Sequence, residues 1–275
     1  VASFGRKLYE SFFRVYTEKV WGVPCRQISA DWAAQRIKGL DLVEVARRAL
    51  RFGASGGPKT LVEEFDSPRL GAGQMSERMR EVLEEAGLRF EFNRPVTGLR
   101  RQKAGGWTVE ASGLSVTAEQ VLSSMPITRL VEVMCPKPLQ KVVESGGRLG
   151  WRDHLTVDLD VEASGLFPDQ WIYVHDPGVR MARLANYANF SRDMTTAGRT
   201  PLSAEYFCFK DDDLWNLADA DLLKLAEEEL ARMGLIQGRR VAAGRVRRER
   251  FAYPSYVVDW QRDFQALREW VDDLD

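Results

Sequence analysis

A series of strand-like segments in the second half of the chain constrains the fold most strongly. Residues 154–161, HLTVDLDV, alternate apolar and polar side chains, as a strand with one buried face does. Three further segments of this type follow, with loops between them: WIYVH, MARLANYA and LSAEYFCF. Because consecutive alternating strands pair readily as neighbours, we predict one antiparallel sheet in this part of the chain.

Helical patterns fill much of the remaining chain. Aromatic and aliphatic side chains recur every four residues over 2–20, which predicts a helix with one buried face that ends before Gly22. Further helices are predicted after Ser29, after Asp41, over 74–86 and 127–147, from Asp219 to Met233 and from Asp259 onward. Further strands are predicted over 88–92, 95–101, 107–112, 114–118, 120–126 and 240–251. The expected fold class is therefore a mixture of helices and sheets, α+β or α/β.

Charge and cysteine content exclude several classes of function. Lys and Arg number 39 against 40 Asp and Glu, so the chain lacks the positive excess of a nucleic-acid-binding surface, and we expect no nucleic-acid partner. No apolar run reaches the roughly 18 residues of a membrane-spanning helix. The cysteines lie far apart without metal-type spacing, so we expect no disulfide framework, no metal site, and a reducing, cytoplasmic location. A small-molecule substrate is the expected partner, and the oligomeric state stays open.

Two glycine-rich segments match nucleotide-binding motifs only in part. GASGGPKT at 53–60 has Pro58 where a phosphate-binding loop needs its second glycine, and proline has no backbone N–H to donate. GAGQMS at 71–76 opens a helix, so its amides could face an anion. However, Ser76 replaces the third glycine of GxGxxG. We therefore predict no nucleoside triphosphatase and no independent dinucleotide fingerprint.

Side chains with catalytic chemistry form no recognisable constellation. His154 and His175, the only histidines, stand in no spacing typical of a zinc site or of a nucleophile's base. Asp211–Asp213 resembles a solvated acidic loop, and the basic run Arg245–Arg250 alternates with apolar residues like the solvent-exposed face of a strand. Catalytic residues stay unassigned. A protein without an evident nucleophile often leaves its chemistry to a cofactor.

Several segments, in order along the chain, resemble one superfamily of flavoproteins. YTEKVWG, residues 16–22, resembles the YTxKQWG stretch of UDP-galactopyranose mutases, with Val20 in place of the usual glutamine. The later segments resemble protoporphyrinogen oxidase-like and amine oxidase-like flavoproteins, the last two in their bacterial members: ISADWAAQRIKGL, PRLGAGQMSERMREVLEEAG, LRFEFNRPVTGLRR, AEQVLSSMP, EYFCFKDDDLWNLADADLLKLAEEEL and FAYPSYVVDW. The common order of these segments carries the resemblance, which covers nearly the whole chain.

The resemblance implies part of an FAD-binding doubly wound domain with an inserted substrate domain. The implied pieces are 1–60, the helical first piece of the substrate domain; 61–150, the middle piece of the FAD-binding domain; 151–258, the substrate-domain antiparallel sheet with its helix; and 259–275, a terminal helix leading back to the FAD-binding domain. The N-terminal GxGxxG strand and the C-terminal flavin motif of those families have no counterpart here. We therefore expect an interior fragment that does not bind FAD tightly by itself.

The same resemblance implies site residues. Those near FAD would be Gly71, Gly73, Met75, Val96, Ser123, Ser124 and Pro126. Those on the substrate side would be Trp21, Arg36 and Tyr253. A strand residue such as Val96 would also be buried without any cofactor, and Arg36 could clamp an anionic substrate or pair with a nearby carboxylate. Cys25, beside this loop, is expected to be inert.

Three functions stay open at this point. The first is an FAD-dependent oxidoreductase of the amine oxidase or protoporphyrinogen oxidase type, in which the substrate loses a hydride to the flavin. The second is a flavin-dependent UDP-sugar mutase, favoured by YTEKVWG and disfavoured by Val20. The third is an inactive scaffold or binding domain.

Overall fold

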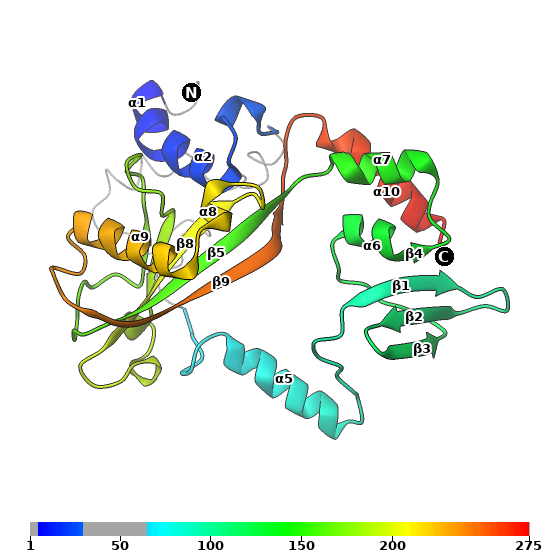
Figure 1. Cartoon of the computed structure of the whole chain (residues 1–275), viewed down its shortest axis with the longest axis horizontal. Helices are drawn as coiled ribbons and strands as arrows, with labels where there is room; N and C mark the ends of the chain where they lie inside the picture. Colours follow the sequence, from blue (N-terminus) through cyan, green and yellow to red (C-terminus); the bar gives the residue numbers. More distant parts are fainter. Residues whose placement is uncertain (1–4, 30–64, 275) are drawn as a thin grey trace, which may run out of the picture. The chain divides into compact units, whose positions relative to one another are not determined.

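The computed structural model describes residues 5–29 and 65–274 (Figure 1). The helices predicted after Ser29 and after Asp41 lie outside these residues, as do the segment 53–60 and Arg36. The chain divides into two compact units, each assembled from three stretches of sequence. Unit 1 comprises Val1–Ser76, Thr156–Tyr206 and Leu217–Arg247, and unit 2 comprises Glu77–Leu155, Phe207–Asn216 and Arg248–Asp275.

Unit 1 begins with the predicted helical segment. α1 (Arg6–Leu8), a π-helical stretch η1 (Tyr9–Arg14) and α2 (Val15–Trp21) follow one another directly. Gly22 ends α2 with a left-handed φ of 68°, which glycine adopts without the steric cost of a Cβ. This ending confirms the predicted helix and its stop. A short 3-10 helix, η2 (Cys25–Gln27), comes next.

The alternating segments form a five-stranded sheet with the strand order β6–β7–β8–β5–β9. Its strands are β5 (Trp151–Val161), β6 (Trp171–Tyr173), β7 (Arg183–Asn186), β8 (Thr200–Cys208) and β9 (Val241–Pro254). β7 pairs antiparallel with both β6 and β8. The predicted sheet is therefore confirmed, and its antiparallel pairing is confirmed for β6–β7 and β7–β8. Along the chain, β5, β8 and β9 each pass from one unit into the other.

The helix α9 (Asp219–Arg232) covers this sheet in unit 1 (Figure 1). Leu222, Ala226 and Leu230 recur at four-residue spacing and are completely buried, as one stripe of an amphipathic helix. At Gly244 of β9, an added Cβ would overlap the Leu223 side chain, so the helix packs directly on the strand. Hydrophobic burial of this stripe is the main stabilisation that α9 receives.

Unit 2 contains a smaller sheet and a group of helices. The sheet has the order β3–β2–β1–β4, from strands β1 (Val96–Arg101), β2 (Trp107–Ala111), β3 (Leu114–Ala118) and β4 (Met134–Cys135). The helices are α5 (Gly73–Glu85), which begins in unit 1, α6 (Ile127–Val133), α7 (Gln140–Arg148), α8 (Asp213–Asn216) and α10 (Trp260–Asp272). β1, β2 and β3 confirm three predicted strands joined by tight turns.

The helices α7 and α10 of unit 2 are held together by apolar and ionic contacts. Val142 of α7 and Leu267 of α10 share a core cluster with Val131 of α6. Arg148 also donates two parallel hydrogen bonds to Asp263, at 2.6 and 3.1 Å. This bidentate contact holds the pKa of the Asp263 carboxyl below its usual value.

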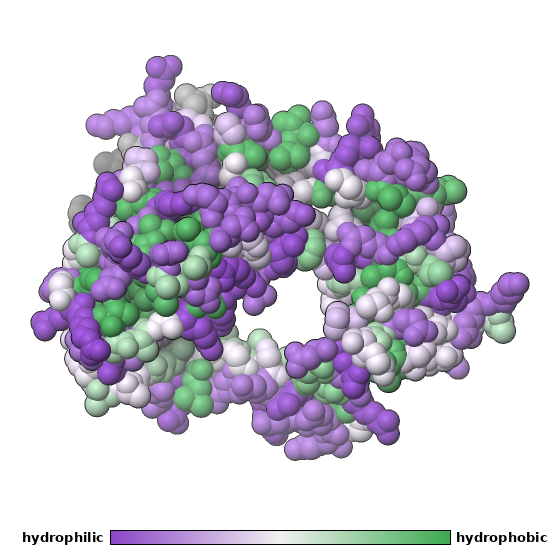
Figure 2. All heavy atoms as spheres, viewed as in Figure 1, coloured by the Kyte–Doolittle hydropathy of each residue, from purple (hydrophilic) through white to green (hydrophobic). Residues whose placement is uncertain are grey.

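Two predicted strands of unit 2 are wrong. Residues 88–92 and 120–126 form no strand, and Leu122 is fully exposed. A strand needs a neighbouring strand for its backbone groups, and neither segment pairs with one among the described residues. Val121 and Met125 still pack on the core around Leu99, so the apolar side chains of the second segment are partly buried without a strand. Figure 2 shows hydrophobic atoms at the surface along α5 as well, where Met75 and Met79 are exposed.

The single helix predicted over 127–147 is also wrong. α6 ends at Val133, and Met134 and Cys135 turn into an extended strand that pairs in parallel with Leu99 and Arg100 of β1. Pro136, the next residue, has no backbone N–H for a helical hydrogen bond, so the helix cannot continue through it. Within the described part of the chain, every helix is too short or too polar to cross a lipid bilayer.

Candidate functional site

A cavity of about 840 Å³ lies within unit 1. Its lining comes from β5, β8 and β9, from the segment 187–194, and from the loop 67–73 that leads into α5. Small-molecule sites in proteins occupy roughly 300–1,000 Å³. The cavity is therefore large enough for a drug-sized ligand or for part of a cofactor.

Apolar side chains form one wall of the cavity. Tyr187, Phe190 and Met194 come from two short 3-10 helices and their junction, η3 (Tyr187–Asn189) and η4 (Arg192–Met194). The rings of Tyr187 and Phe190 lie with their centroids 6.1 Å apart. The opposite strands add Leu159, Pro201, Leu202 and Ala243. This wall favours an apolar or aromatic ligand body.

The turns that carry this wall are fixed by local side-chain caps. The Asn186 side chain accepts a hydrogen bond from the Ala188 N–H at 3.2 Å. The Ser191 hydroxyl accepts one from the Asp193 N–H at 3.2 Å. Asn and Ser compete well for nearby backbone donors, which explains why the chain leaves the sheet after β7 at these residues.

The loop 67–73 is tied to the same wall. Arg69 Nε donates to Asp193 at 2.6 Å, and Gln74 Oε1 accepts from the Leu70 N–H at 3.2 Å. Gly71 has a left-handed φ of 91°, and an added Cβ there would lie 3.0 Å from the Met194 Cε. A side chain at this position would therefore be strained and would press on the wall.

Asp158 on β5 is the centre of the charged part of the lining. Its carboxylate accepts hydrogen bonds from Nη2 of Arg245 at 3.4 Å and contacts Nη2 of Arg247 at 3.1 Å. It also accepts a hydrogen bond from the Ser203 hydroxyl. Both arginines stand on β9, the neighbour of β5 in the sheet, so cross-strand geometry brings the charges together.

A second group of ion pairs continues from Asp158 along β5. Arg199 Nη1 contacts Asp160 at 3.2 Å, and its Nη2 contacts Glu162 at 3.5 Å. Arg240 contacts Glu162 at 2.7 Å. Every carboxylate in the described cavity lining is therefore already paired with an arginine.

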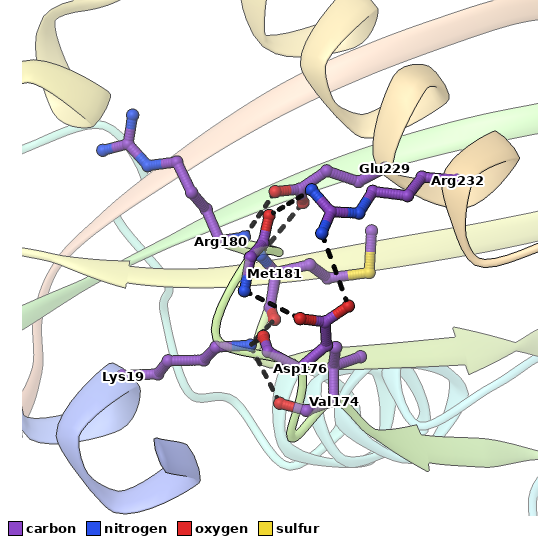
Figure 3. A network of polar contacts seen from close by, with 8 residues as sticks. Lys19, Val174, Asp176, Arg180, Met181, Glu229 and Arg232 are labelled. Carbon is purple, nitrogen blue, oxygen red and sulfur yellow. Dashed lines mark hydrogen bonds and ion pairs between the residues drawn. The ribbon is translucent and has the colours of Figure 1, made fainter.

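A separate polar network in unit 1 holds α2 and α9 to the loop between β6 and β7 (Figure 3). Lys19 Nζ donates to the carbonyl oxygens of Val174, Asp176 and Met181 at 2.8–3.0 Å. Burial lowers the pKa of Lys19 to about 8, against the opposing effect of Glu229 and Asp176. Through these three contacts Lys19 ties α2 to the segment between β6 and β7.

Glu229 completes this network from α9. Its carboxylate accepts hydrogen bonds from the backbone N–H groups of Arg180 and Met181 and from the Tyr206 hydroxyl, the last at 3.1 Å. Burial raises the pKa of Tyr206, so the phenol stays protonated as the donor. Arg232 on the same helix donates to the Gly178 carbonyl at 3.0 Å.

The residues predicted near FAD fall into two groups. Gly71 and Gly73 line the cavity of unit 1, and Met75 follows them on α5 with 61% of its surface exposed. The others belong to unit 2: half-buried Val96 at the start of β1, exposed Ser123 and Ser124, and Pro126 as the N-cap of α6. Of the residues predicted near FAD, the structure places only Gly71 and Gly73 together in the lining of the cavity.

The predicted substrate-side residues are also separated. Trp21 is buried at the end of α2 in unit 1. Tyr253 lies on β9 in unit 2, with its ring 5.7 Å from that of Phe207. Arg36 lies outside the described residues. Neither Trp21 nor Tyr253 lines the cavity.

The arginine run lies on β9, and Arg245, Arg247 and Arg250 are exposed, which confirms its interpretation as the solvent-exposed face of a strand. The sequence interpretation did not include that Arg245 and Arg247 line the cavity or that Arg250 contacts the buried Asp153 at 3.0 Å. The two-residue spacing of Asp158 and Asp160 and of Arg245 and Arg247 was the available indication. This spacing predicts ion pairs only once β5 and β9 are known to be neighbours in the sheet.

Other sequence interpretations concern residues outside the cavity. His154 packs against Phe207 and His175 against Tyr16. Asp212 accepts from the Phe209 N–H at 2.7 Å, and the described residues contain no group of His, Cys, Asp and Glu suited to a metal ion. Burial raises the pKa of the Cys25 thiol, which agrees with its expected inertness.

Comparison with known proteins places these features in a family. The family described as flavin containing amine oxidoreductase matches residues 3–268. No curated protein matches the chain significantly.

Three solved structures illustrate the structural similarity. Reduced UDP-galactopyranose mutase is 17% identical with a TM-score of 0.76, covering 96% of this chain and 56% of that one. A candidate protoporphyrinogen oxidase from Exiguobacterium sp. 255-15 is 18% identical with a TM-score of 0.59, covering 90% and 50%. Putrescine oxidase bound to putrescine is 18% identical with a TM-score of 0.51, covering 71% and 44%.

These similarities confirm the predicted fold class and the predicted superfamily. The chain has the α+β architecture of FAD-binding oxidoreductase folds. It spans about half the length of the first two structures, 56% and 50%. At sequence identities this low, the similarity supports the same fold but does not identify the substrate.

Proposed function

Because the chain belongs to the flavin-containing amine oxidoreductase family, we propose that it is part of an FAD-dependent oxidoreductase of the amine oxidase and protoporphyrinogen oxidase type. Its substrate would lose a hydride to the flavin. The cavity of unit 1 is the observation that carries this proposal, because its lining combines an apolar wall with the backbone of Gly71 and Gly73. Cavities with apolar walls and a few polar groups are the usual substrate sites of enzymes.

The backbone of Gly73 leaves room for a ligand group. No atom lies within 4 Å of the position that a Cβ of Gly73 would take, so a planar group could lie against its backbone. Apolar side chains of the cavity could contact the face of a planar ligand, and its arginines could donate hydrogen bonds to polar atoms at the ligand's edge. When bound, FAD would supply the hydride acceptor.

The chain's own residues would bind and orient the substrate. Tyr187, Phe190 and Met194 would exclude water from its apolar part. Arg245 and Arg247 would hold a polar end through hydrogen bonds from their guanidinium groups. These contacts fix the reacting bond in one orientation, which is the protein's part in a cofactor-dependent reaction.

The two compact units suggest how the expected domains correspond to the structure. We assign most of unit 1 to the substrate domain and most of unit 2 to the FAD-binding domain, because the larger part of the expected pieces 1–60 and 151–258 falls in unit 1. Residues 151–155, 207–216 and 248–258 of the expected substrate domain fall in unit 2. In this assignment Gly71, Gly73 and Met75 stand where the chain passes between the domains. Val96, Ser123, Ser124 and Pro126 would contact FAD from unit 2, and Trp21, Arg36 and Tyr253 stay proposed substrate-side residues.

The visible spectrum of the purified protein tests the oxidoreductase proposal. A flavin absorption band that bleaches under anaerobic conditions when an amine or a porphyrinogen is added would support it. A protein that carries flavin but is not reduced by either compound would contradict it.

A flavin-dependent sugar mutase is the second candidate. The TM-score of 0.76 to reduced UDP-galactopyranose mutase and the YTEKVWG segment favour it. Conversion of a UDP-sugar by the dithionite-reduced protein, without net oxidation, would select this function over the first.

A scaffold without activity is the third candidate. We propose that these 275 residues alone do not bind FAD tightly, which is consistent with their covering 56% of the mutase structure. The test compares the flavin content of this chain with that of any longer product of the same reading frame. If FAD titration leaves both colourless, the two enzyme functions fail and the scaffold remains.

A further inference from the structure

An apolar face of unit 2 lies at the surface, on α5 and on the segment 88–92 that follows it. Five large apolar side chains of this face are 37–62% exposed: Met79, Val82, Leu88, Phe90 and Phe92. A group of exposed apolar side chains of this size usually marks an interaction surface. We propose that this face binds the same face of a second copy of the chain, with the two 88–92 segments paired as antiparallel strands.

The segment 88–92 has the pattern of a strand but pairs with no strand among the described residues. Its sequence, LRFEF, alternates apolar and charged side chains. The rings of Phe90 and Phe92 lie nearly parallel, at 10° with their centroids 6.0 Å apart. Side chains two residues apart point to the same face of an extended chain. One face of the segment is therefore apolar, and the other carries Arg89 and Glu91.

The backbone of this segment is available for pairing. Within the part of the chain that the structure describes, Arg89 and Phe90 make no backbone hydrogen bond. Extended backbone with open donors and acceptors readily adds a further strand. The Leu88 N–H donates to the last turn of α5 at 2.9 Å, and the Arg80 guanidinium lies 6.0 Å from the centre of the Phe92 ring. Because α5 holds both ends of the segment, pairing orders few further residues.

The charges of the segment complement those of a second copy. In an antiparallel pair centred on Phe90, Arg89 lies opposite Glu91 of the second copy, and Leu88 lies opposite Phe92. The two-fold symmetry of such a dimer makes each of these pairs occur twice. Opposite charges directly across an antiparallel pair stabilise it, and like charges destabilise it. This self-complementarity favours a second copy over a chain of unrelated sequence.

The same charges fix the register of the pair. Moving the centre of the pairing to Arg89 would put two arginines opposite each other, and moving it to Glu91 would put two glutamates there. Within one chain, Glu91 contacts Arg94 at 2.9 Å, but these side chains are 52% and 39% exposed. Solvent screens an ion pair of this kind, so it competes little with the contact across the dimer.

Sedimentation equilibrium of the complete chain over a concentration series tests the proposal first. We expect a reversible equilibrium between the monomer and a species of twice its mass, because an isologous interface closes on itself. A monomer at every concentration would overturn the proposal, and so would a series of species that grows without limit. The proposal is independent of the proposed function, since no flavin or substrate takes part in the pairing.

Two charge reversals test the predicted register. Arg89→Glu places a carboxylate opposite Glu91 of the second copy, and Glu91→Arg places a guanidinium opposite Arg89. Each variant alone should dimerise about tenfold more weakly than the parent chain, because both attractive pairs become repulsive. An equimolar mixture of the two variants should recover dimerisation to within about threefold, since every pair then joins opposite charges. A mixture that stays monomeric would overturn the proposed pairing.

Matched variants outside the segment control for general effects of charge. Arg268→Glu reverses a charge on α10 at a side chain that is 64% exposed, and should change dimerisation less than about twofold. Equal weakening by Arg89→Glu and Arg268→Glu would contradict a contact at Arg89, because only the net charge would then matter. Circular dichroism of each variant verifies that its fold is unchanged.

Hydrogen exchange of the parent chain tests the site of pairing without any substitution. Amides of 88–92 should exchange more slowly as the protein concentration rises, because strand pairing protects them. The strand β3 stands at the end of the strand order of its sheet, so its amides 114–118 are the matched control and should keep their rates. Slowing of β3 in place of 88–92 would overturn the proposal, since the dimer would then form at another edge.

Discussion

Gly71 shows how a single backbone angle shapes the cavity. Its φ of 91° turns the loop 67–73 towards the wall residue Met194. Every residue with a Cβ meets a steric cost in this region of conformational space. Gly73, two residues later, has no left-handed φ, and a Cβ added to it would meet no atom within 4 Å, so the two glycines form a natural pair for comparison.

We expect Gly71→Ala to lower the free energy of unfolding by about 1–2 kcal/mol, from the left-handed φ and the contact with Met194. Gly73→Ala should leave it unchanged or slightly higher, because alanine is favourable in a helix. Urea unfolding of both variants measures the difference. Equal effects would show that the backbone of Gly71 carries no special constraint.

The fold lowers the pKa of Lys19, and this shift makes the stability of the protein depend on pH. Its pKa is lowered to about 8 from 10.5, chiefly by burial. Between these values the unfolded chain holds a proton on Lys19 that the folded chain has released. Stability therefore rises with pH through this window, and the contribution is lost as the pH falls through 8.

The Lys19→Met variant makes this contribution measurable. The free energy of unfolding of the parent protein minus that of Lys19→Met should increase by roughly 1 kcal/mol between pH 7.5 and 9.5, with partial exposure reducing the full linkage. Lys224→Met, on an amine with 75% of its side chain exposed, should show no such change. A flat or falling difference for Lys19 would mean that the carbonyl contacts stabilise the ammonium form.

At the scale of elements, α9 is positioned by apolar packing and by one buried carboxylate. Leu222, Ala226 and Leu230 supply the packing. Glu229 supplies the directional contacts, because it accepts two backbone N–H groups from the β6–β7 loop and the Tyr206 hydroxyl. A buried carboxylate is tolerated only where donors of this kind surround it.

Glu229→Gln should therefore lower the free energy of unfolding by about 2–4 kcal/mol, because an amide N–H₂ would face backbone donors. Glu228→Gln, one residue earlier and 64% exposed, should lower it by less than about 0.5 kcal/mol. Thermal unfolding followed by circular dichroism compares the two. Similar losses would show that helix charge, and not the buried network, determines the effect.

At the scale of the whole molecule, the chain is assembled from non-contiguous segments. Each unit draws on three stretches of sequence. All residues that line the cavity belong to unit 1. Its lining residues range from Ser67 to Arg247, so tertiary structure alone brings them to one place. Ligand binding should accordingly act first on the strands that line the cavity.

Hydrogen exchange measures this expectation. With any ligand that binds in the cavity at about 100 times its Kd, amides in 157–161 and 241–247 should open up to about 100-fold less often. Amides of α7 and α10 should keep their rates, since these helices supply no lining residue. Equal slowing in α7 and α10 would contradict a site confined to the cavity.

Secondary structure and superfamily could be predicted where local patterns were strong. The alternating run 154–161, the helix ending at Gly22 and the helix stopped near Gly87 all have local causes, namely strand periodicity and glycine stops. The alternating segment 88–92 and the apolar segment 120–126 were predicted as strands and are not. Either pattern gives a strand only if another strand pairs with it, and pairing is not local.

The sequence alone therefore determined the mixture of helices and sheets, the likeness to flavoproteins and the glycines at the start of α5. The pairing of β5 with β9 was decided by the tertiary structure, and with it the meeting of Asp158 with Arg245 and Arg247. The physical reason is that these charges stand 87 and 89 residues apart. Residue type and spacing describe which face of a strand a side chain occupies, whereas the identity of its partner depends on which strand lies beside it.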